Sequence, residues 1–144
     1  MEAPLVDRAS RDVGAIVLRD LIDGRITNDE FMSSFPRGSD LALLAVLDFA
    51  WRQFSDLRVH TLTGRDSPTP ERQAMLERCL LFLSTDLEFE WPSPRHSIGR
   101  QLLQVLTLGR CFRLSAEEYK SKGEFEVWPF LRRGDYEAHA QRPR

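Results

Sequence analysis

Residues 41–54 read LALLAVLDFAWRQF, the most apolar stretch of the chain. On a helix these apolar side chains cover nearly every side, and Asp48 and Arg52 stand four positions apart on the one polar edge. Ser39 lies just before the stretch and is a suitable helix N-cap. A helix of this kind must be covered by other elements, so the stretch predicts a central helix with Trp51 in the core.

Helix signals also occur on both sides of this stretch. An amphipathic helix over residues 10–22 is predicted by apolar residues at helical spacing, namely Val13, Ile16, Val17, Leu21 and Ile22. Thr27 and Glu30 match a capping box, and Phe35-Pro36 ends the short helix that the box begins. The chain therefore predicts a pair of helices before the central one.

A further long helix is predicted from Thr69-Pro70, since proline suits the first helical position. Its expected buried face consists of Met75, Leu76, Cys79, Leu80, Phe82 and Leu83. Shorter helices are expected from Ser93-Pro94 or Ser97 to Gly109, at about residues 115–122, and after Asp135. The predicted fold is mainly α: one globular domain over residues 1–144, a compact bundle of about six or seven helices, with a short basic tail at about 140–144.

Two similar segments interrupt the helical pattern. EFEWP spans residues 88–92 and EFEVWP spans residues 124–129, and in both segments apolar residues alternate with glutamates. Alternation is typical of a half-buried strand, so the segments predict at most a small two-stranded element with Phe89 and Phe125 facing the core. Because opposing like charges disfavour a direct register, a staggered pairing and no pairing remain alternatives.

Composition limits the function. The 144 residues contain 42% hydrophobic residues, and 20 Lys and Arg against 22 Asp and Glu give a formal charge of −2. No overall positive field favours nucleic acid or anionic lipid. No stretch approaches the roughly 20 apolar residues of a membrane span, and the N-terminus does not resemble a secretory signal. We therefore expect a cytoplasmic protein in which Cys79 and Cys111 are buried, reduced thiols.

Common catalytic and cofactor motifs are absent. The sequence contains no phosphate-binding glycine loop, no H-E-x-x-H, no G-x-S-x-G and no paired C-x-x-C. His60, His96 and His139 are scattered, and none has a second ligand at metal-binding spacing. We therefore expect no catalytic residues, no metal and no cofactor.

The most distinctive polar feature is a set of acids beside two tryptophans. It consists of Asp86, Glu88, Glu90, Trp91, Glu124, Glu126 and Trp128. The simplest interpretation is the solvated side of segments whose aromatics build the core. A second interpretation is a surface for a basic protein partner, which neighbouring aromatics favour. A third is a metal or acid-base site. We take the seven residues as candidate partner-binding residues.

At ERCLLFLSTDLEFEWP and GEFEVWPFLRRGDYEAH the chain resembles small uncharacterised bacterial cytoplasmic proteins, including proteins of the toxin-immunity type. The resemblance covers roughly residues 71–92 and 123–139. That resemblance implies an inhibitor that occludes a toxin with a basic cleft and performs no chemistry of its own. We therefore expect a non-catalytic protein-binding module. The alternatives are a small hydrolase or metal-dependent enzyme that uses the clustered carboxylates, and a structural homo-oligomer that buries Trp91 and Trp128.

Overall fold

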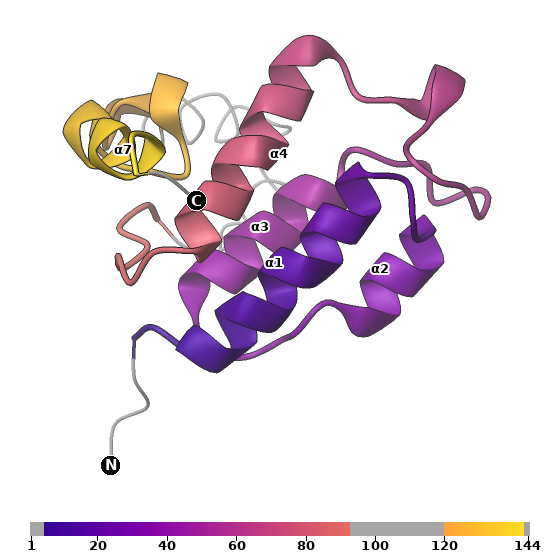
Figure 1. The fold of residues 1–144 in the computed structure, drawn as a ribbon, viewed down its shortest axis with the longest axis horizontal. Coiled ribbons are helices and arrows are strands. Elements are labelled where there is room, and N and C mark those ends of the chain that lie inside the picture. The colour runs from indigo at the N-terminus through magenta and orange to yellow at the C-terminus, as the bar shows by residue number, and fades with distance from the viewer. Residues whose placement is uncertain (1–4, 93–119, 143–144) are drawn as a thin grey trace, which may run out of the picture. The chain divides into compact units, whose positions relative to one another are not determined.

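A computed structural model describes residues 5–92 and 120–142. The chain divides into two compact units, Met1–Glu88 and Phe89–Arg144, and each is described by itself. The described residues form five α-helices and two short 3-10 helices and contain no strand (Figure 1). The mainly helical class is thereby confirmed. The helices expected between residues 93 and 119 lie outside the described residues, and the single domain over residues 1–144 stays a prediction.

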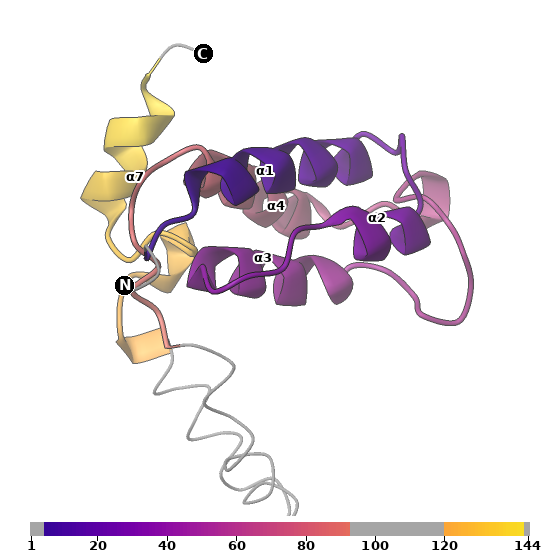
Figure 2. The same cartoon turned by 90° about the horizontal axis from the view of Figure 1, so that it is seen from below.

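The first unit is a four-helix arrangement. It contains α1 (Arg8–Ile22), α2 (Asn28–Ser34), α3 (Leu41–Trp51), α4 (Pro70–Leu83) and the 3-10 helix η1 (Gly64–Asp66). Helix α1 packs against both α2 and α4, and α3 packs against α4 (Figure 2). Helix α3 supplies the residues Ala42, Leu43, Ala45, Val46 and Ala50 to the core. Its predicted central position is therefore confirmed within this unit.

The helix starts follow local capping chemistry. The Thr27 hydroxyl accepts from the Glu30 amide at 3.2 Å, and the Glu30 carboxylate accepts from the Thr27 amide at 2.7 Å. Thr69 caps α4, in which Pro70 is the first residue. Helix α3 begins differently from the prediction, because Asp40 rather than Ser39 caps it, accepting from the Ala42 amide at 3.0 Å. The predicted capping box and the Thr69-Pro70 start are confirmed.

Two burial predictions are wrong. Val13 and Ile16 were expected to face the core, but they are 49% and 64% exposed, and α1 instead buries Arg11, Gly14, Leu18 and Leu21. Trp51 was expected in the core and is 44% exposed. It is the last residue of α3, which ends before the predicted Phe54, and its indole N–H donates to the Asp56 carboxylate.

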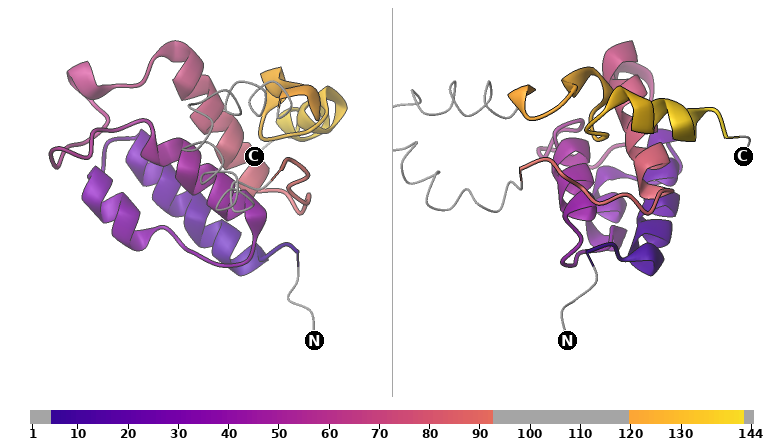
Figure 3. Two further views of the ribbon diagram at one scale, coloured as in Figure 1. Left: turned by 180° about the vertical axis from the view of Figure 1, so that it is seen from behind. Right: turned by 90° about the vertical axis from the view of Figure 1, so that its left-hand side faces the viewer.

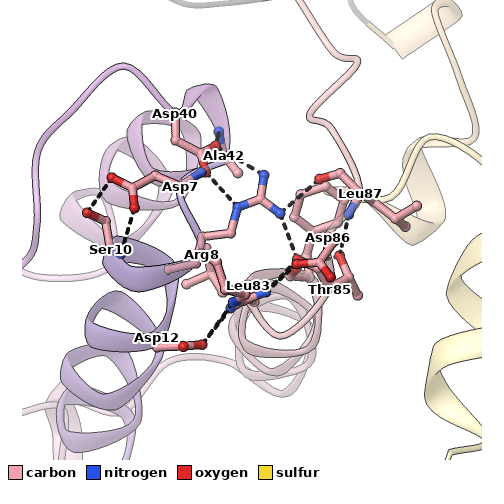
Figure 4. A network of polar contacts seen from close by, with 12 residues as sticks. Asp7, Arg8, Ser10, Asp12, Asp40, Ala42, Leu83, Thr85, Asp86 and Leu87 are labelled. Carbon is pink, nitrogen blue, oxygen red and sulfur yellow. Dashed lines mark hydrogen bonds and ion pairs between the residues drawn. The ribbon is translucent and has the colours of Figure 1, made fainter. Parts of the chain in front are cut away.

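The buried face of α1 is determined by an ion pair with the start of α3. Arg11 and Asp40 are 0% and 1% exposed. The Arg11 Nε donates to Asp40 Oδ2 at 2.7 Å and its Nη2 donates to Oδ1 at 3.1 Å. The same carboxylate accepts from the backbone amides of Asp7 and Ala42 (Figure 4). Asp40 is therefore both the cap of α3 and the anion that holds α1.

The same arginine helps to fasten the end of α4. Arg11 Nη1 donates to the carbonyl oxygens of Thr85 at 2.9 Å and Leu87 at 2.8 Å. Arg8 donates to the carbonyl oxygens of Thr85 and Leu83. Cations beside the C-terminal carbonyls of a helix satisfy groups that have no partner within the helix and stabilise the negative end of its dipole. The network therefore joins α1, α3 and α4 at one end of the first unit.

The second unit contains the 3-10 helix η3 (Phe125–Val127) and α7 (Arg133–Ala140). Trp91 donates its indole N–H to the Phe130 carbonyl at 3.2 Å and packs edge-to-face on Phe125. The expected two-stranded element is absent from the described residues. Residues 87–92 form no strand there, and η3 uses its amides locally, as in the 3.0 Å hydrogen bond from the Trp128 amide to the Phe125 carbonyl.

Candidate functional site

The predicted acidic residues are divided between the two units. Asp86 and Glu88 end the first unit, whereas Glu90, Glu124 and Glu126 belong to the second. All five acids are exposed. The two tryptophans of the same prediction are buried: Trp91 is 2% and Trp128 is 5% exposed. The indoles belong to the aromatic core of the second unit, so the surface of these segments is formed by the acids.

Nearby arginines pair with three of the five acids. The pairs are Asp86 with Arg8 at 3.3 Å, Glu90 with Arg132 at 3.5 Å, and Glu124 with Arg133 at 3.4 Å. Within residues 5–92 and 120–142, Glu88 and Glu126 make no ion pair. Their charges are therefore the least compensated of the set.

A different surface, missed by the sequence analysis, lies between α3 and α4. We call residues 52–60 the α3–α4 loop; it is part of the connection that extends from the helices in Figure 3. Three large apolar side chains are exposed on it or on the helix residue just before it: Leu57 at 96%, Val59 at 62% and Trp51 at 44%. Single exposed apolar residues are ordinary, so we treat these three, which lie within ten positions of one another, as a candidate interaction surface.

Asn28 holds the backbone of this loop in place. Its side chain is 5% exposed, and its Nδ2 donates to the carbonyl oxygens of Ser55 and Arg58, both at 3.0 Å. Its Oδ1 accepts from the His60 amide at 2.9 Å, and its own amide donates to the His60 carbonyl at 2.9 Å. One side chain at the start of α2 thus satisfies three backbone groups of the loop, which orders it before any partner arrives.

Aromatic packing supports the other part of the loop. Phe54 packs edge-to-face on Phe31 with ring centroids 6.2 Å apart, and on His60 at 6.4 Å. The Trp51 indole donates to Asp56 Oδ1 at 2.9 Å, which holds this half-exposed ring beside the loop. The exposed side chains therefore project from an anchored backbone.

A pocket of about 230 Å³ lies between this loop and α2. Its lining includes Asp29, Met32, Phe54, Asp56, Leu57 and Arg58. Arg58 donates to Asp66, and this hydrogen bond lowers the pKa of the Asp66 carboxyl. In the described part of the chain, neither Asp29 nor Asp56 makes an ion pair. The pocket thus combines an apolar wall with two carboxylates that lack a cation.

The other titratable residues were examined for metal-binding groups and reactive thiols. Across the described ranges, no three His, Cys, Asp or Glu side chains are grouped so that they could hold a metal ion. Cys79 is buried and free, as predicted, and burial raises the pKa of its thiol. Cys111 and His96 lie outside the described residues. No described helix is both long and apolar enough to span a membrane.

Comparisons with known proteins give no relative: no family model matches the chain, and no match was found among curated proteins or solved structures. The function must therefore be inferred from the geometry of the chain itself. The only sign of the α3–α4 loop in the sequence is Leu57 and Val59 in a polar stretch, SDLRVHT at residues 55–61, that has no helical or strand period.

Proposed function

We propose that this protein is a non-catalytic protein-binding module, and that its most concrete form is a cytoplasmic immunity or inhibitor protein that binds and occludes a bacterial toxin. The observation that supports the proposal most directly is the exposure of Leu57 and Val59 on a loop whose backbone is held by Asn28. An enzyme site would require convergent reactive groups, whereas this surface offers apolar area on an ordered support.

Burial of these exposed apolar side chains would contribute favourably to the free energy of binding. Burying a fully exposed leucine or valine against a partner is worth about 1.5–3 kcal/mol. An ordered loop also avoids much of the entropy that a flexible segment loses on binding. Leu57 is almost fully exposed, so nearly its whole side chain is available for this gain. The loop can therefore supply apolar contact area at the core of an interface, with polar neighbours forming the rim.

The acidic residues of each unit remain part of the proposal as charges that steer a basic partner toward the protein. Charged groups outside the centre of an interface mainly affect the rate of association and its salt dependence. Glu88 and Glu126 are the acids to test first, because reversal of Glu90 or Glu124 would also break an ion pair. We expect Glu88→Lys with Glu126→Lys to slow association with a basic partner, and the slowing to weaken as salt rises.

The proposal is tested with matched surface variants. Tagged protein carrying Leu57→Ser and Val59→Ser is compared with wild type and with a control carrying Val13→Ser and Ile16→Ser, which changes two exposed apolar residues on α1. Partners retained from cells that encode the protein are identified by mass spectrometry, purified and measured by calorimetry. We expect the loop variant to bind at least about tenfold more weakly and the control to bind normally.

Equal affinity of the loop variant and wild type would contradict the proposed surface, as would a loss confined to the α1 control. The inhibitor function is tested separately by co-expression with the neighbouring reading frame, the first toxin candidate. Wild type and the α1 control should protect growth, and the loop variant should not. A neighbouring product that is harmless alone would remove the support for the toxin-inhibitor version.

A further inference from the structure

We propose that the pocket between the α3–α4 loop and α2 binds the guanidinium end of an arginine side chain presented by the protein partner. This inference rests on the proposed function and specifies the chemistry that the partner must bring. It is supported by the charges at the pocket, by its apolar wall and by the position of the exposed loop residues.

The carboxylates that line the pocket favour a positively charged ligand. Asp29 and Asp56 both line it, and neither has a cationic partner among the described residues. Arg58 is the one cation in the described lining, and its guanidinium is paired with Asp66. Asp56 uses only Oδ1 for the Trp51 indole, so its second oxygen is open to a further donor. An incoming anion would meet two carboxylates of like charge, whereas a guanidinium would meet charges of the opposite sign.

The apolar wall fits the rest of an arginine side chain. Met32 and Phe54 are half-buried residues of the lining. An arginine typically buries its methylene stem on apolar surface while its planar head hydrogen-bonds to carboxylates or stacks on an aromatic ring. Leu57 and Val59 also line the pocket, so an arginine inserted there would bring its flanking residues onto them. The pocket would thus set the register of the apolar contact.

The experiment is a ¹H–¹⁵N NMR titration of the full chain with Nα-acetyl-argininamide. The matched probe is Nα-acetyl-citrullinamide, which has nearly the same shape and no charge. The arginine probe should shift amides within residues 28–32 and 54–59 with saturation, and the citrulline probe should not. The variant with Asp29→Asn and Asp56→Asn should bind the arginine probe about tenfold more weakly. Glu71→Gln, an exposed acid in the first turn of α4, should leave binding unchanged.

Both aspartates are largely accessible side chains, so the double variant should fold, which its amide spectrum will verify. Equal shifts with citrulline, shifts outside the two ranges, or undiminished binding by the double variant would overturn the proposal. The result is separable from that of the proposed function. If Leu57→Ser with Val59→Ser abolishes partner binding while arginine leaves the pocket amides unmoved, the pocket proposal fails and the protein-binding function stands.

Discussion

Replacing Arg11 with methionine should destabilise the first unit far more than replacing Arg19 with methionine. Both arginines lie on α1 and both form a two-pronged ion pair, Arg11 with Asp40 and Arg19 with Glu77. The pairs differ in burial. Arg11 and Asp40 are 0% and 1% exposed, whereas Arg19 and Glu77 are 31% and 38% exposed. The comparison thus holds helix and substitution constant, while the two arginines differ in access to water and in the two backbone carbonyls that Arg11 also holds.

The expected magnitude follows from the groups left behind. Arg11→Met leaves the Asp40 carboxylate buried with only the backbone amides of Asp7 and Ala42 as donors. Removing one partner of a buried ion pair costs about 3–5 kcal/mol. The Leu87 carbonyl also loses the Arg11 donor. Arg19→Met breaks a partly exposed pair, for which about 1 kcal/mol or less is expected.

Urea unfolding followed by circular dichroism at 222 nm measures the difference. With a denaturant slope of about 2 kcal/mol per molar, a loss of about 4 kcal/mol moves the midpoint down by about 2 M, and the Arg19 variant should move by about 0.5 M or less. Asp40→Asn should behave like Arg11→Met, because it leaves the buried guanidinium without its anion. Midpoints for the two arginine variants within error of each other would refute the argument that burial makes this pair essential.

Three further predictions concern other single sites. Asn28→Ala removes the three side-chain hydrogen bonds that hold the α3–α4 loop. Hydrogen exchange of the amides of residues 55–60, measured by NMR, should therefore accelerate, and the free energy of unfolding should fall by about 2 kcal/mol. Unchanged exchange would contradict the anchoring role. Gly24→Ala should lower the melting temperature by several degrees, because φ is +69° and a Cβ would lie 2.5 Å from the Thr63 Cγ2; calorimetry that shows no loss would contradict this. Burial raises the pKa of the Cys79 thiol, so above about pH 8.5 the unfolded chain releases a proton that the folded chain retains. The free energy of unfolding should therefore fall as the pH rises. Between about pH 8 and 10, the urea midpoint of Cys79→Ala should fall less than that of wild type.

The starts of α2 and α4 could be predicted because their signals are local. The Thr27 and Glu30 side chains satisfy each other's amides within one turn, and Thr69-Pro70 needs only its own helix. The buried face of α1 depends on a distant residue. Arg11 is inside because Asp40, 29 positions later, accepts its hydrogen bonds, and hydrophobic periodicity assigns a charged residue to the surface. Apolar spacing alone therefore placed Leu21 correctly but Val13 and Ile16 wrongly.

The candidate surface was missed for a related reason. Leu57 and Val59 have no periodicity that would distinguish a binding loop from an ordinary connection. Their significance depends on Asn28, which lies 27 and 30 positions from the two carbonyls to which it donates. The acids were conspicuous in the sequence, but the arginines that pair with Glu90 and Glu124 lie 42 and 9 positions away. Whether an apolar side chain is exposed, and whether an acid has a cationic partner, depends on the tertiary structure and cannot be read from a short motif.

The polar network and the candidate surface lie at opposite ends of the same helices. Arg11 and Asp40 stand at the starts of α1 and α3, whereas Trp51 ends α3 and leads into the α3–α4 loop (Figure 1). Helix α3 has 11 residues, which separates its ends by about 16 Å. Changes this far apart with no shared partner should combine additively. An Arg11→Met protein that is still folded should therefore keep its affinity for a partner, whereas Asn28→Ala should lose affinity through disorder of the loop. If both variants lose affinity in proportion to their loss of stability, the surface is not an independent site, and partner binding depends on the whole unit.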